Sequence, residues 1–68
     1  MTTFYVTDCV DGDDDGSFER LFREQIAPLA FERRAKADGV RFGPMRFCYF
    51  PNAHGVTMIA AEADVVSG

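Results

Sequence analysis

One stripe of apolar residues with helical spacing, flanked by strand-like segments, limits what this chain can fold into. From Ser17 onward apolar positions recur at intervals of three and four residues, the period of one buried face of an α-helix. A helix that is apolar on one side only has to pack against another layer, and the rest of the chain supplies strands. The residues of the stripe are Phe18, Leu21, Phe22, Ile26 and Leu29.

Pro28 interrupts this stripe. Proline has no backbone N–H, and its ring clashes with the carbonyl four residues earlier, here that of Glu24. We therefore expect the helix to kink at Pro28, or to end near Ala27 and restart with Pro28 in its first turn. A straight helix would turn Arg33 inward and Phe31 outward, so a kink that resets the phase gives the better pattern.

Three segments are typical of strands, because β-branched and aromatic residues dominate them. They cover residues 4–10, 45–50 and 56 to about 65. Residues 40–42 are extended as well, but Gly43 and Pro44 interrupt them. The predicted order is β-α-β-β, an α+β fold. A right-handed crossover followed by an antiparallel hairpin gives a small three-stranded sheet with one kinked helix on one face.

The chain is short, with 68 residues that we assign to a single small domain, 1–68. A core of this size rarely supplies more than about 3–5 kcal/mol, so a staple or a second copy usually adds stability. The predicted strands are apolar on both faces, yet one helix covers only one of them. We expect the second face to be covered by a partner protein or by a homodimer, in which each chain is half of a ferredoxin-like arrangement.

Composition excludes several classes of function. Hydrophobic residues make up 47% of the chain, as in a packed domain and unlike a disordered tail. The formal charge of −4 disfavours direct binding to nucleic acid, whose phosphates need a lysine- and arginine-rich face. No apolar run approaches the roughly 18 residues that span a bilayer. With no signal sequence ahead of the first strand, we expect a soluble cytoplasmic protein whose Cys9 and Cys48 are free thiols packed as small hydrophobes.

The densest chemical signal is an acidic run at residues 8–19, which holds six carboxylates and no basic residue. Its DxDxDG pattern resembles the first half of an EF-hand calcium loop over nine residues. The likeness fails at the twelfth position, where Phe22 stands in place of the bidentate glutamate, so a site would need Glu24 or another chain to complete it. The candidate calcium ligands are Asp11, Asp13 and Asp15.

The same run favours an electrostatic hypothesis. Residues 1–24 carry seven acids and two bases, a net charge of −5, whereas residues 25–50 carry two acids and five bases, a net charge of +3. A dense cluster of like charges costs folding energy, so its field is expected to attract a cationic partner. An acidic face can dock on the basic groove of a nucleic-acid-binding protein in place of phosphates. The candidate partner-binding residues are Asp11, Asp13, Asp14, Asp15, Glu19 and Glu24.

These features predict a non-enzymatic protein-interaction module that blocks a basic partner surface. Small inhibitors made by phages and mobile elements, including anti-CRISPR proteins, are similar in size and in this use of charge. The alternative is a calcium-binding domain, and otherwise no cofactor is expected. A thiol enzyme built on Cys48 and His54 is a third, weaker hypothesis, because no acid is placed to orient the histidine and no phosphate-binding glycine loop occurs.

Overall fold

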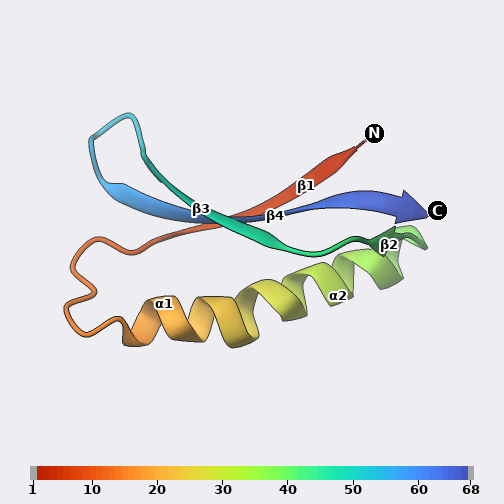
Figure 1. Cartoon of the computed structure of the whole chain (residues 1–68), viewed down its shortest axis with the longest axis horizontal. Coiled ribbons are helices and arrows are strands. Elements are labelled where there is room, and N and C mark those ends of the chain that lie inside the picture. Colours follow the sequence, from red (N-terminus) through yellow and green to blue (C-terminus); the bar gives the residue numbers. More distant parts are fainter. Residues whose placement is uncertain (1, 68) are drawn as a thin grey trace.

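The α+β fold is confirmed by a computed structural model, which describes residues 2–67 and their side chains as far as Val66. A helix lies along one face of an antiparallel sheet (Figure 1), and the elements follow the predicted order with one additional short strand. The strands are β1 (Thr3–Cys9), β2 (Arg41–Phe42), β3 (Arg46–Pro51) and β4 (Thr57–Ser67). The helical segments are α1 (Ser17–Leu21), η1 (Phe22–Ile26) and α2 (Ala27–Asp38).

The sheet is built around β4, which pairs antiparallel with β1 on one side and with β3 and β2 on the other. Because β1 and β3 both run antiparallel to β4, they are parallel to each other, and the helix makes the crossover between them. This arrangement is a split β-α-β unit. The sheet contains one strand more than predicted, because β2 pairs with the end of β4 beyond the break at residues 43–45.

The helix continues without a break from α1 to α2 and absorbs Pro28 by widening its turn. The N–H of Ala27 donates to the carbonyl of Phe22, five residues back, and Pro28 lies in the first turn of α2. The predicted kink is therefore a π-helical segment, the usual insertion of one residue into an α-helix. The helix ends at Gly39, whose φ of 65° is a left-handed conformation that glycine adopts without strain.

The π-helical segment changes which residues are buried. Positions facing the sheet are spaced four, five, four and four residues apart: Phe18, Phe22, Ala27, Phe31 and Ala35. Phe31 is buried and Arg33 is exposed, as the reset of phase predicted. Leu21 and Leu29, which we assigned to the stripe, are instead 40% and 46% exposed. The extra residue in η1 turns Leu29 away from the sheet, whereas the exposure of Leu21, which precedes η1, does not depend on it.

The core lies between the helix and the odd-numbered residues of β4. Phe22, Ala27 and Phe31 from the helix pack on Ile59, Ala61 and Ala63. Small side chains along β4 let the helix approach closely, and phenylalanines fill the space at its sides. Phe4 and Phe42 each contact Phe31, with ring centroids 5.2 and 5.1 Å from it. This aromatic group fixes the C-terminal half of the helix against β1 and β2.

The opposite face of the sheet is open in the described chain and carries both cysteines. Cys9 and Cys48 are free thiols, as predicted, but they are exposed, so their assignment as packed hydrophobes is wrong. On the same face Arg46 pairs with Glu62 and Asp64, at 3.0 and 3.3 Å. Half of the face is thus polar and paired within the chain. The predicted homodimer through this face stays a prediction.

Candidate acidic interaction site

The acidic residues lie in a short connection between β1 and α1, which we call the acidic loop (residues 11–16). It is folded by its own backbone: the N–H of Asp13 donates to the Val10 carbonyl at 3.2 Å, and that of Gly16 donates to the Asp13 carbonyl at 3.4 Å. Gly12 and Gly16 have φ values of 84° and 74°, which glycine tolerates and other residues rarely adopt. The loop emerges at one end of the elongated molecule (Figure 1).

Two carboxylates of the loop cap the helix. Both oxygens of Asp13 accept backbone hydrogen bonds, from the N–H of Phe18 at 3.1 Å and of Glu19 at 3.0 Å. Asp15 accepts from the N–H of Ser17 at 3.0 Å, and this bond lowers the pKa of Asp15. The first N–H groups of a helix lack partners within it and carry partial positive charge, so aspartate stabilises them.

Asp13 lies three residues before Gly16, the position from which a helix is normally capped. The position before the helix is occupied by Gly16, which has no side chain to cap with. The turn between Val10 and Gly16 instead brings Asp13 back over the first helical turn. A glycine directly before the helical stripe was the signal that a residue further upstream had to supply the cap.

The remaining candidate acids divide into paired and unpaired groups. Glu19 lies 3.2 Å from Arg23 in an i,i+4 ion pair. Asp11, Asp14 and Glu24 are exposed, and no ion pair joins them to another residue of the chain between 2 and 67. The structure therefore brings Asp11, Asp14 and Asp15 together at the surface of the loop, and Glu24 follows on the exposed side of η1.

Most of the basic residues are already neutralised elsewhere. Arg34 pairs with Asp38 at 2.7 Å and Lys36 with Glu32 at 3.3 Å, both along α2. Arg23 also donates to the hydroxyl of Tyr49 at 2.9 Å. These cations do not screen the loop. Arg20, exposed on α1, is the cation nearest to the loop in sequence, and no ion pair joins it to a loop carboxylate among residues 2–67, so the exposed carboxylates act as a negative surface.

The structure does not gather the candidate calcium ligands into a coordination site. Among residues 2–67 no three His, Cys, Asp or Glu side chains are placed to hold a metal ion. Asp13 directs both oxygens at helix amides, which compete with any cation for them. Calcium binding stays a prediction, and a rise in melting temperature at millimolar calcium that is lost in Asp11→Asn is the result that would support it.

The structure does not place Cys48 and His54 as a catalytic pair would require. Cys48 projects from β3 on the open sheet face, whereas His54 is exposed in the turn between β3 and β4. That turn is organised by Asn52, whose side-chain oxygen accepts the backbone N–H groups of His54 and Val56 at 2.8 and 3.0 Å. Within the described residues no hydrogen bond joins the two side chains.

Comparison of the chain with models of known families, with curated proteins and with solved structures gives no match. Among residues 2–67 no helix has the length and apolar character needed to cross a membrane.

Proposed function

We propose that this protein is a non-enzymatic interaction module whose acidic loop engages a basic surface of a nucleic-acid-binding protein and blocks it. The observation that carries the proposal is a group of exposed carboxylates that form no ion pair among residues 2–67: Asp11, Asp14 and Glu24. Asp15 belongs to the same loop, and its carboxylate accepts one hydrogen bond, from the N–H of Ser17. They lie at one end of the molecule, on a rigid support of helix and sheet. Keeping them unpaired costs stability, and binding a cationic surface recovers it.

The blocking mechanism is occupation of phosphate sites. Arginine and lysine side chains in a nucleic-acid groove are spaced to meet phosphates, and carboxylates presented at one end of the molecule can take the place of those phosphates. Association is then fast and sensitive to salt. The analogy is with small inhibitors of nucleic-acid enzymes that phages make, such as anti-CRISPR proteins. This mode of action requires no cofactor.

The test uses Asp11→Asn/Asp14→Asn, because neither side chain makes a contact that holds the fold. The matched control is Glu32→Gln/Asp38→Asn, which removes the same amount of charge from the other half of the helix. The partner is first captured on the wild-type chain from the source cell, identified by mass spectrometry and purified. Binding of each variant to it is then measured by calorimetry at two salt concentrations.

We expect Asp11→Asn/Asp14→Asn to weaken binding about tenfold, equivalent to about 1.4 kcal/mol, and the control to stay within about twofold. The captured partner should be basic and should be displaced by DNA or RNA. Equal affinity of the loop variant and the wild type, or a contact confined to the open sheet face, would contradict the proposal.

A further inference from the structure

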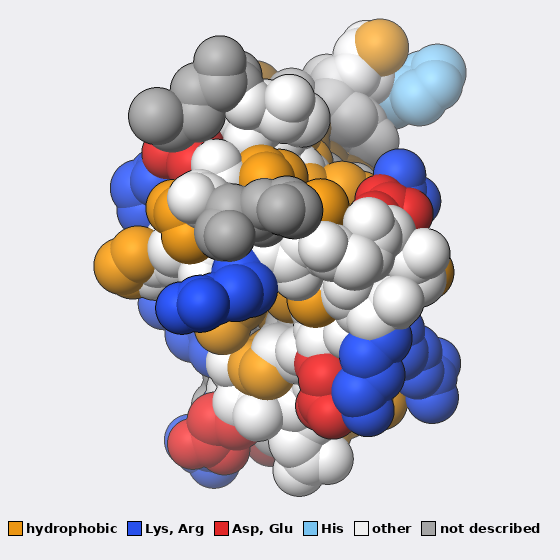
Figure 2. Space-filling model, turned by 90° about the vertical axis from the view of Figure 1, so that its right-hand side faces the viewer, with side chains coloured by type: hydrophobic (Ala, Val, Ile, Leu, Met, Phe, Trp, Pro, Cys, Tyr) orange, Lys and Arg blue, Asp and Glu red, His pale blue; other side chains and the backbone are white. Residues whose placement is uncertain are grey.

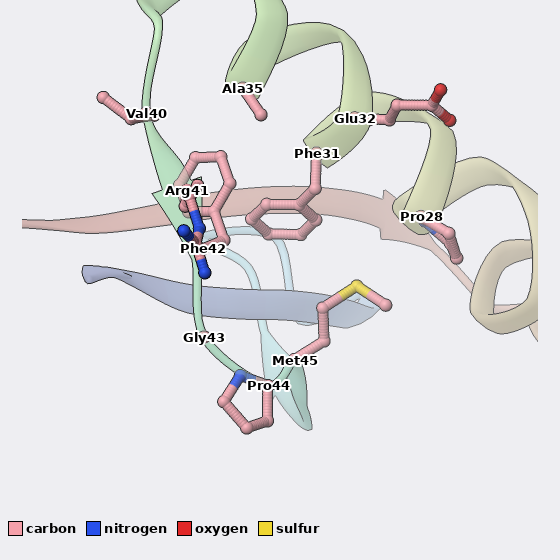
Figure 3. A pocket seen from close by; sticks show the side chains of 10 residues that line it. All are labelled: Pro28, Phe31, Glu32, Ala35, Val40, Arg41, Phe42, Gly43, Pro44 and Met45. Atoms are coloured by element: carbon pink, nitrogen blue, oxygen red, sulfur yellow. The ribbon is translucent and has the colours of Figure 1, made fainter. Parts of the chain in front are cut away.

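A groove of about 530 Å³ lies at the other end of the helix, between α2 and residues 40–45. Figure 3 shows Phe31 reaching down from the helix toward Phe42, with Met45 and Pro44 closing the opposite side. Its size is in the range of ligand-binding clefts. Its apolar lining comes mainly from Pro28, Phe31, Ala35, Val40, Phe42 and Met45.

One positively charged side chain stands at this groove. Arg41 lines it, is exposed, and forms no ion pair with residues 2–67. Glu32, the acid of the lining, turns away from the other side chains (Figure 3) and pairs with Lys36 at 3.3 Å. Lys and Arg side chains appear on several sides of this end of the molecule, with apolar and acidic side chains between them (Figure 2). The groove thus presents an apolar surface next to one cation.

The groove also borders a free sheet edge. β2 and β3 pair only with β4 among the described strands, so their other side presents backbone N–H and C=O groups to solvent. These groups are directional, and an extended peptide satisfies them by adding as a further strand. A fatty acid offers the same tail and carboxylate but cannot pair with the edge, which favours a peptide.

We propose that this groove binds an extended peptide of a partner protein. The peptide adds to the β2–β3 edge, places one apolar side chain against Phe31 and Met45, and sets a carboxylate on Arg41. Alternate side chains of a strand point to the same face, so one side chain of the peptide enters the groove while its neighbours face outward. The carboxylate is either an acidic side chain or the C-terminus of the peptide.

This site does not depend on the function proposed for the acidic loop. The two surfaces lie at opposite ends of the helix and select opposite charges. The Asp11→Asn/Asp14→Asn variant should bind peptide as the wild type does at physiological salt, so failure of one proposal leaves the other standing.

The experiment selects ligands from a displayed library of random heptapeptides and then measures binding of the enriched sequences, as synthetic peptides, to the full chain. Each is made with a free and with an amidated C-terminus, which separates the two sources of carboxylate. The variant is Arg41→Gln, and the matched control is Arg33→Gln, an exposed arginine on α2 outside the groove lining. Amide shifts in NMR spectra locate the bound peptide.

We expect enriched peptides to carry an aromatic or branched aliphatic residue close to an acid. Arg41→Gln should weaken them at least tenfold and Arg33→Gln less than twofold, with shifts concentrated at residues 28–51. Ala35→Leu, which fills the groove, should also abolish binding while circular dichroism shows an intact fold. The proposal is overturned if no sequence is enriched, if Arg41→Gln binds as well as the wild type, or if the shifts map to the open sheet face.

Discussion

Asp13 is the residue of the acidic loop whose role the structure defines most closely, because both of its oxygens accept N–H groups of the first helical turn. Removing a helix cap of this kind costs about 1–2 kcal/mol. Asp13→Ala should lower the free energy of unfolding by that amount, whereas Asp14→Ala, an exposed neighbour, should change it by less than about 0.5 kcal/mol. Urea denaturation monitored by circular dichroism measures both, and equal losses would show that the cap is not formed.

Asp64 gives the chain a predictable response to acid. The hydroxyl of Thr3 donates to it at 2.6 Å and Arg46 lies beside it, and both lower the pKa of Asp64 from its ordinary value of 3.8. A carboxyl with a lower pKa in the folded state adds stability above its unfolded pKa, and that stability is lost as the pH falls through the folded pKa. Asp64→Asn should therefore flatten the dependence of unfolding free energy on pH below about 4. An unchanged slope in the variant would argue against the ion pair.

At the scale of elements, the π-helical segment makes a prediction that a straight helix does not. A straight helix would bury Leu29 and turn Phe31 outward, but in the structure Phe31 is buried and Leu29 is 46% exposed. Phe31→Ala should cost about 3–5 kcal/mol, enough to unfold a domain of this size, whereas Leu29→Ala should cost no more than about 1 kcal/mol. Melting temperatures of the two variants decide the phase, and a larger loss for Leu29→Ala would favour a straight helix.

The helix also shows which structural features can be predicted from the sequence and which cannot. The strand-like segments, the helix start at Ser17 and the disturbance at Pro28 were predictable, since each rests on local chemistry. The insertion of one residue in η1 was not, because burial of Ala27 and Phe31 selects it only once β4 is in place. β2 and the exposure of the cysteines likewise depend on which strand takes the centre of the sheet, a choice that no local pattern records.

The acidic loop likewise combines features that local sequence predicts with features that depend on the fold. Its charges follow from composition, and Asp11 and Asp14 are exposed, while their role in binding a partner stays a prediction. Which aspartates cap the helix and which stay exposed could not be predicted, because it depends on the conformation of the turn that places Asp13 over the helix. An experiment that neutralises Asp13, Asp14 and Asp15 together would confuse loss of binding with loss of stability.

At the scale of the whole molecule, the helix separates the acidic loop, which we propose binds cations, from the groove, which we propose binds an anionic peptide. It covers residues 17–38, about 33 Å at 1.5 Å per residue, in a molecule whose longest dimension is 38 Å. At physiological ionic strength the Debye length is about 8 Å, so the acidic loop exerts little force on an anion at the groove. At 0.01 M it is about 30 Å, and the field of the loop reaches the groove.

The affinity of the groove for an acidic peptide should therefore depend on the loop only at low salt. Peptide titrations of the wild type and of Asp11→Asn/Asp14→Asn should give equal dissociation constants at about 0.15 M salt and tighter binding by the variant at about 0.01 M. Attraction to Arg41 strengthens at low salt in both proteins, so their ratio isolates repulsion by the loop. Glu32→Gln/Asp38→Asn, with the same net charge but the change close to the groove, should bind more tightly already at 0.15 M. A difference between loop variant and wild type that persists at high salt would mean that the two ends communicate through structure, because screened charges could not produce it.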